Sequence, residues 1–222
     1  MAVLMFSASS CGGQKNGSSE DAGDYSHIDI QLYPNDYEDA FAVKDLLTGL
    51  GYIVVVGGSS EPDPVELSME NPSPVHLVTE DYECIFFQDG DLSIEGRQIN
   101  KQDVDSGNNV CVVGRDAAPT LFEGREDVLN MELELLGDRF RVIGVYEYED
   151  ESSALFTFVP ITAAKKMGDV RIDYITVCLE RGKDVRAEAK AIYDLLKEEG
   201  YDVSMNYYDC YDRPAGSIPR AD

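Results

Sequence analysis

The spacing of apolar residues switches from strand-like to helical and back near the N-terminal end of the chain. Apolar and polar residues alternate over residues 28–32, which predicts a β-strand. Apolar residues then recur at helical spacing, at Ala40, Val43, Leu47 and Leu50. Asp36 offers a cap before this helix, and Gly51 ends it. An apolar run over residues 52–56, closed by Gly57-Gly58, predicts a second strand.

A second β-α-β pattern lies near the C-terminal end. A strand, a helix and a strand are predicted over residues 174–179, 185–196 and 201–205. The two segments align without a gap, so that Gly51-Tyr52 of the first matches Gly200-Tyr201 of the second. Two such units side by side predict a ferredoxin-like sheet with both helices on one face.

The middle of the chain has a different sequence pattern, with short β-rich runs separated by turns. The expected strands cover residues 75–78, 84–87, 110–113, 131–136, 140–148 and 155–159. Leu136-Gly137-Asp138-Arg139 lies between two of these runs and predicts a hairpin. Two short helices are expected over residues 117–122 and 162–167.

These patterns predict an α+β fold with two lobes. Residues 25–60 and 171–208 are expected to form a split β-α-β, ferredoxin-like lobe, because each unit needs the other to complete a sheet. Residues 61–170 are expected to form an inserted, mostly-β lobe. Residues 209–222, after the second half of the split lobe, are expected to be a polar tail. The Pro-rich entry at residues 62–74 and the crossing near Gly168 are the expected hinges.

Residues 1–24 are expected to be an export signal remnant or a lipoprotein-like tether. An apolar stretch over residues 1–6 is followed by small residues and then Cys11, which makes Cys11 a candidate for lipidation. The stretch is shorter than a typical signal core, and no basic segment precedes it. The Ser/Gly-rich residues that follow are typical of a flexible tether.

The charge balance excludes one class of partner. The 222 residues include 43 Asp and Glu against 18 Lys and Arg, a formal net charge of −25. A field of that sign repels phosphate backbones, so nucleic acid is not an expected partner. The same charge is compatible with cationic partners or simply with solubility.

The five cysteines have no C-x-x-C spacing, so neither a redox motif nor a zinc site is indicated. If Cys11 is lipidated, the other four could form two disulfides. The interpretation we favour is that Cys111 and Cys178, each inside a strand-like run, are buried free thiols.

The sequence predicts no catalytic, cofactor-binding or metal-binding residue, and the protein is not expected to be an enzyme. No G-x-x-x-x-G-K-[ST] motif is present, and the only histidines, His27 and His76, lie in or beside predicted strands. The acidic residues 147–151 are interpreted as a solvated strand end. The tyrosines at 207, 208 and 211 fit either an interface or the rim of a small sheet.

Several short motifs occur together in a characteristic order. An alternating strand, a glycine and a short helix ending in Leu-Phe cover residues 110–122, followed by an acidic turn, a hairpin over 131–141 and a Val-x-Gly-Val strand over 142–145. The chain thereby resembles the MacB-like extracytoplasmic (periplasmic) core domain of ABC transporter permeases, the MacB/FtsX-type family, over about residues 26–208. The residues that carry the resemblance are Gly96, Arg97, Gly114, Phe122, Gly144 and Pro160.

The sequence also departs from the family pattern. Where the family usually has a Gly-Lys pair before the hairpin, this chain has Val128-Leu129-Asn130. The membrane helices that flank the domain in family permeases are not found in these residues. The six residues that carry the resemblance are interpreted as shaping turns and packing.

The resemblance implies a non-catalytic domain at the extracytoplasmic face of the cell membrane. It is expected to act with permease membrane helices and a cytoplasmic ABC ATPase subunit, and to engage an accessory protein or an exported substrate. The alternative is a free-standing, lipid-anchored surface lipoprotein or binding module on the same fold, attached through Cys11. Neither reading involves a cofactor.

Overall fold

A computed structural model gives the fold, and it describes residues 26–60, 75–86, 92–148, 154–180, 182–208 and 216–220. The strands are β1 (Ser26–Leu32), β2 (Ile53–Ser60), β3 (Val75–Val78), β4 (Leu92–Gly96), β5 (Val110–Gly114), β6 (Glu132–Leu135), β7 (Asp138–Tyr148), β8 (Thr157–Pro160), β9 (Val170–Leu179), β10 (Val203–Tyr208) and β11 (Gly216–Ile218). The helices are α1 (Tyr37–Gly49), α2 (Glu83–Phe86), α3 (Lys101–Ser106), α4 (Ala118–Leu121), α5 (Ile161–Met167) and α6 (Val185–Glu198).

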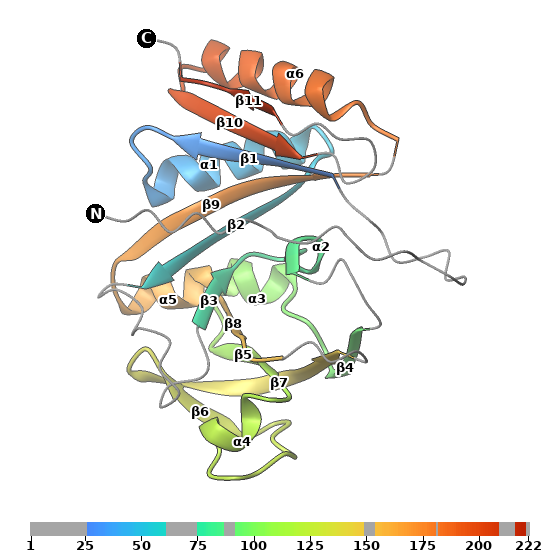
Figure 1. The fold of residues 1–222 in the computed structure, drawn as a ribbon. Helices are drawn as coiled ribbons and strands as arrows, with labels where there is room; N and C mark the ends of the chain where they lie inside the picture. Colours follow the sequence, from blue (N-terminus) through green and yellow to red (C-terminus); the bar gives the residue numbers. More distant parts are fainter. Residues whose placement is uncertain are drawn as a thin grey trace.

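The strands form one continuous sheet that runs through the whole molecule (Figure 1). Its order is β11-β10-β1-β9-β2-β3-β8-β5-β7-β4, and β6 pairs with β7. The pairs β3–β8 and β5–β7 are parallel, and the remaining ladders are antiparallel. A mixed sheet with helices packed on it confirms the predicted α+β class.

The two β-α-β units lie where the periodicity predicts them. Their strands interleave in the order β10-β1-β9-β2, and the buried residues of α1 and α6 belong to one apolar cluster on one face of these strands. Asp36 and Asp184 cap the two helices, each accepting a backbone N–H three residues later. Leu50 is the exception within the predicted stripe of α1, because it lies past the last helical residue and is exposed.

The sheet continues from the β-α-β units into the middle of the chain through the β2–β3 ladder. Gly57 pairs with Val78 and Gly58 with Leu77. The expectation that Gly57-Gly58 closes the strand is wrong, since β2 continues to Ser60 beside β9. Glycine is needed here because a Cβ on Gly58 would lie 2.2 Å from the backbone oxygen of Arg171.

Two short helices in the middle of the chain correct the sequence prediction. The strand expected over residues 84–87 is wrong, because residues 83–86 form α2, whose turn places the aromatic rings of Tyr82 and Phe86 four residues apart on one side. The helix α3 was not expected, since Val104 is its one apolar residue. Its signal was Asn100 followed three residues later by Asp103, which form a capping box.

The core consists of two apolar clusters on opposite faces of the sheet. In β2, Val54 and Val56 face the cluster beneath the helices, whereas Val55 faces a second cluster that contains Tyr82, Tyr146 and Phe158. The predicted hairpin between β6 and β7 is present, and the left-handed backbone of Leu136 and Gly137 matches a type I′ turn.

We predict that Gly58→Ala lowers the free energy of unfolding by about 1–3 kcal/mol, because the new methyl group would overlap a backbone oxygen that cannot move aside. Chemical denaturation measures the change. Gly49→Ala is the matched control, since a Cβ there meets nothing within 4 Å, and it should leave stability within about 0.5 kcal/mol of wild type or raise it. Equal stability of the two variants would show that β2 and β9 do not approach as described.

Candidate functional site

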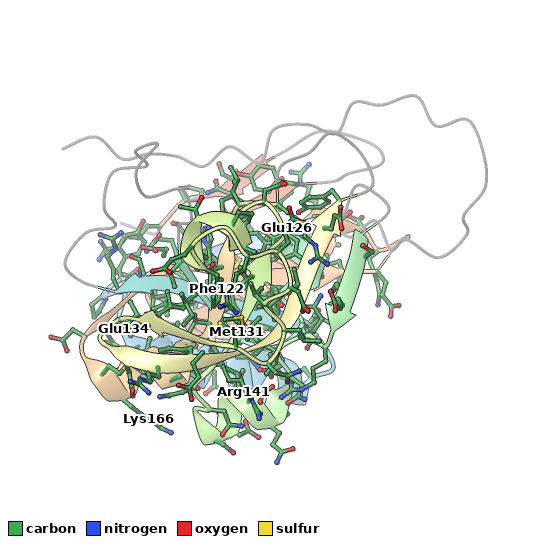
Figure 2. The ribbon with its side chains drawn as sticks, turned by 90° about the horizontal axis from the view of Figure 1, so that it is seen from below. Phe122, Glu126, Met131, Glu134, Arg141 and Lys166 are labelled. Carbon is green, nitrogen blue, oxygen red and sulfur yellow. A yellow bond between two sulfur atoms is a disulfide. The ribbon has the colours of Figure 1, made fainter. Side chains whose placement is uncertain are left out.

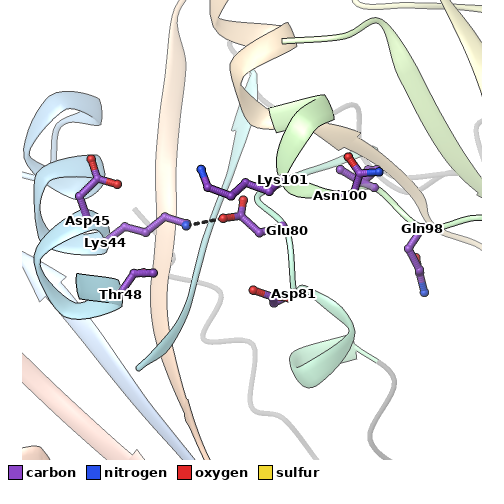
Figure 3. A pocket seen from close by; sticks show the side chains of 9 residues that line it. Lys44, Asp45, Thr48, Glu80, Asp81, Gln98, Asn100 and Lys101 are labelled. Atoms are coloured by element: carbon purple, nitrogen blue, oxygen red, sulfur yellow. Dashed lines mark hydrogen bonds and ion pairs between the residues drawn. The ribbon is translucent and has the colours of Figure 1, made fainter. Parts of the chain in front are cut away.

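An open cleft of about 440 Å³ lies between α1 and the segments that follow β3 and β4 (Figure 3). It brings together residues from three separate parts of the chain. Its lining residues are Lys44, Asp45, Thr48, Glu80, Asp81, Gln98, Ile99, Asn100 and Lys101. The cleft therefore has α1 on one side and residues from the middle of the chain on the other.

A buried ion pair crosses this cleft. The Lys44 ammonium lies 2.7 Å from Oε1 of Glu80, and the two side chains are only 8% and 12% exposed. Lys44 occupies the buried stripe of α1 between Val43 and Leu47. The other carboxylate oxygen of Glu80, Oε2, is buried and has no hydrogen-bond partner in the described part of the chain. Burial also raises the pKa of the neighbouring Asp81, with a smaller contribution from Glu80.

Sequence reasoning missed this pair, although the signal was present. A lysine at position 44 falls on the same helical face as Ala40, Val43 and Leu47, where a charge needs a partner. The partner could not be identified from the sequence, since Glu80 lies beyond β3 and reaches α1 only through the sheet order.

The opposite wall of the cleft is held by one of the residues singled out from the sequence. The Arg97 guanidinium contacts both carboxylate oxygens of Asp103, at 2.5 and 3.1 Å. Burial of Asp103 acts to raise its pKa, but hydrogen bonds from Arg97, Asn108 and the Asn100 backbone outweigh burial and hold the pKa below its usual value. The ion pair thereby fixes the capping box of Asn100 and Asp103, and Asn100 lines the cleft.

Gly96 and Gly144 lie directly opposite each other on β4 and β7, next to Arg97. A Cβ on Gly96 would come within 2.4 Å of the Ile143 oxygen, and one on Gly144 within 2.4 Å of the Arg97 oxygen. The structure thus brings Gly96, Arg97 and Gly144 together, and the absence of side chains lets the two strands and the Arg97 segment approach closely.

The other three residues that carried the resemblance are dispersed. Gly114 ends β5, where a Cβ would lie 1.9 Å from the Ala154 oxygen. Phe122 follows α4 and is buried in the cluster that includes the β6–β7 hairpin (Figure 2). Pro160 ends β8 and precedes the first residue of α5. None of these three residues lines the cleft.

A disulfide joins Cys84 of α2 to Cys178 of β9, 94 positions apart in the chain. The interpretation of Cys178 as a free thiol is therefore wrong: the strand order places Cys178 beneath α2, which the sequence prediction had taken for a strand. Cys111 is free and buried, as predicted, and burial raises the pKa of its thiol to about 12. Cys11 and Cys210 lie outside the described residues.

We call residues 79–86 the clasp, because this segment is tied to several separate parts of the chain. Thr79 exchanges hydrogen bonds of 3.0 Å with the backbone of Val56 on β2, and Glu80 pairs with α1. The Tyr82 hydroxyl donates to Gln98 in the cleft wall. On the far face of the sheet, Cys84 is bonded to β9, and its backbone oxygen lies 3.1 Å from Nε2 of His27 on β1.

Both histidines lie on strands of the sheet, His27 on β1 and His76 on β3. His76 lies among the rings of Phe86, Phe156 and Phe158, and burial lowers the pKa of its imidazole to about 4. The pKa of His27 is also lowered, chiefly by burial. Both rings are therefore neutral near pH 7, and they contribute packing rather than charge.

The remaining candidates fall on the surface or outside the described residues. Glu147 pairs at 3.5 Å with Arg115, whereas residues 149–153 and Tyr211 are not among those the structure describes. Tyr207 packs against the core, and Tyr208 is exposed. Within the described ranges, no His, Cys, Asp and Glu side chains are grouped to hold a metal ion. No helix in the described residues has the length and apolar character of a membrane span.

Comparisons with known proteins agree on one family. The family model of the MacB-like periplasmic core domain matches residues 9–195. The periplasmic region of MacB from Actinobacillus actinomycetemcomitans superposes with a TM-score of 0.60 at 22% identity, covering 83% of this chain and 91% of that one. The extracellular domain of the ABC-type transporter YknZ from Gram-positive bacteria gives 0.52 at 18% identity, covering 80% and 98%. A comparison with curated proteins gives no match.

We predict that Glu80→Gln lowers the free energy of unfolding by about 3 kcal/mol, because it leaves the Lys44 ammonium buried without its counter-charge. The double variant Lys44→Met/Glu80→Leu should recover most of this loss, since it removes both charges. Asp194→Asn, which breaks the exposed Lys190–Asp194 pair, is the control and should cost about 0.5 kcal/mol or less. An equal cost for Glu80→Gln and Asp194→Asn in urea titrations would contradict the burial described here.

Reduction of the Cys84–Cys178 disulfide should lower stability by roughly 2–5 kcal/mol, because the bond closes a long chain segment. Denaturation with and without reductant measures the difference. The variant Cys84→Ala/Cys178→Ala should be destabilised already and insensitive to reductant, whereas Cys111→Ala should retain the full response. If reductant did not change the stability of the wild-type protein in these denaturation measurements, the bond would be shown not to form.

Proposed function

The chain belongs to the family of MacB-like periplasmic core domains, and on this premise we propose that it is the non-catalytic, extracytoplasmic domain of an ABC transporter permease. The observation that carries the proposal is the family match over residues 9–195. The described residues support it in one further respect. Contacts between separate elements, namely the Lys44–Glu80 and Arg97–Asp103 ion pairs and the Cys84–Cys178 disulfide, are suited to a mechanical role.

In this proposal, the chemical step is ATP hydrolysis by a cytoplasmic ABC ATPase subunit, and permease membrane helices carry the motion to this domain at the outer face of the cell membrane. A partner or an exported substrate can be coupled to that motion only if it binds one arrangement of the domain better than another. The cleft crossed by Lys44 and Glu80 is the place where such arrangements would differ, since its two walls come from separate parts of the chain.

In the proposed division into a split β-α-β lobe and an inserted lobe, the two lobes move relative to each other about two hinges. One proposed hinge is the chain connection at Gly168 between α5 and β9. The other is the connection at residues 62–74, which lies outside the described residues. The clasp spans the two lobes on both faces of the sheet, so it sets how far they can separate. An accessory protein or an exported substrate is the proposed partner, and nucleic acid is not, because of the net charge of −25.

We expect an antibody against residues 26–208 to detect the protein in the membrane fraction of the native cell, accessible to protease added from outside. Precipitation from mild detergent should recover an ABC ATPase subunit, identified by mass spectrometry through its G-x-x-x-x-G-K-[ST] sequence. The control is the same precipitation with an excess of purified chain added as competitor, which should remove the ATPase.

Two outcomes would contradict the proposal. A protein found only in the soluble fraction would exclude a permease domain. A membrane-bound protein that recovers no ATPase and that Cys11→Ala releases into the medium would instead support the lipid-anchored binding module.

A further inference from the structure

A second groove, distinct from the cleft, lies at the end of the sheet where β1 ends and α6 turns into β10. Its volume is about 330 Å³. Its lining residues are Leu32, Tyr33, Pro34, Asp39, Glu199, Gly200, Tyr201 and Asp202. Every charged residue among them is acidic, and two tyrosines lie beside the carboxylates. We call it the Tyr33 groove.

An arginine of the chain itself contacts two of the residues that line this groove. The guanidinium of Arg220 lies over the ring of Tyr33, with its central carbon 4.6 Å from the ring centroid, and it is ion-paired with Asp202. This is how proteins recognise a guanidinium group, by an aromatic face and a carboxylate together. Arg220 is held there lightly, since its side chain is 54% exposed and a short strand, β11, leads to it.

The groove has more carboxylates than Arg220 pairs with. Asp202 also has Lys197 at 3.7 Å, but among the described residues neither Asp39 nor Glu199 has a cationic partner. Two carboxylates in the groove thus remain available to a second or third positive group. The net charge of −25 would also favour the approach of a cationic segment.

We propose that the Tyr33 groove docks an arginine-bearing segment of a partner polypeptide, and that Arg220 occupies the groove in its absence. The partner's arginine takes the place of Arg220 on the Tyr33 ring and Asp202, and neighbouring basic residues of the same segment pair with Asp39 and Glu199. The proposal concerns this chain's own groove and holds whether or not the domain acts within a permease.

The test is calorimetric titration of the full chain with an acetylated and amidated tetra-arginine peptide. Arg220→Gln should bind the peptide at least about threefold more tightly than wild type, because the internal competitor is gone. Arg139→Gln is the matched control: it removes the same charge from an exposed arginine on β7 and should leave the affinity unchanged. Thermal unfolding checks that each variant folds.

A second pair of variants localises the binding. Asp39→Asn/Glu199→Gln should weaken binding at least about fivefold, since it removes the two available carboxylates. Glu132→Gln/Glu134→Gln removes the same charge from exposed positions on β6, at the opposite end of the molecule, and should not weaken it (Figures 1 and 2). Tetra-lysine should bind less tightly than tetra-arginine, because an ammonium cannot stack as a plane on Tyr33.

Several outcomes would overturn the proposal. One is an affinity that Arg220→Gln does not raise, and another is an equal loss in the β6 variant. Equal binding of tetra-lysine would show attraction to net charge alone. A wild-type dimer that Arg220→Gln dissociates would assign the groove to a second copy of the chain instead.

Discussion

The structure depends on one turn that holds the sheet together beside one of its two shortest ladders. Only two residue pairs register β2 with β3, and the clasp follows immediately after them. On one face of the sheet the clasp places Glu80 against Lys44, and on the other it places Cys84 against Cys178. A buried ion pair is stabilising only where its geometry is maintained, and the covalent bond on the opposite face restrains the turn that maintains it.

The cleft and the Tyr33 groove differ in how their charges are satisfied. Lys44 in the cleft and Arg97 behind its wall are each paired with a carboxylate that is at most 12% exposed, so these two ion pairs hold the walls in place. In the Tyr33 groove the arginine is exposed, and Asp39 and Glu199 have no cationic partner among the residues that the structure describes. The ion pairs at the cleft therefore stabilise the fold, whereas the Tyr33 groove is suited to binding a partner in place of Arg220.

The elements that the sequence predicted are those whose own periodicity determines them. The alternation at residues 28–32 and the stripe of α6 are local patterns, and both elements lie where expected. The short helix α2 was mistaken for a strand, because four apolar and aromatic residues carry no period. The partners of Lys44 and Cys178 could not be predicted, since Glu80 and Cys84 reach them only through the order of the strands. The family could be recognised because its short motifs, such as the Val-x-Gly-Val strand that contains Gly144, are local in the sequence.

The strand order also has a consequence for how the chain reaches its native state. The strands β1 and β2 are never neighbours: β1 lies between β10 and β9, and β2 lies beside β9. The N-terminal β-α-β unit is therefore synthesised long before β9 and β10. Until these strands emerge, both edges of β1 and one edge of β2 lack their partners, and only the other edge of β2 can pair, with β3. Contacts so distant in sequence slow folding and leave strand edges exposed to other chains. A protein built in this order needs its first unit to be kept apart from its own copies until β9 arrives.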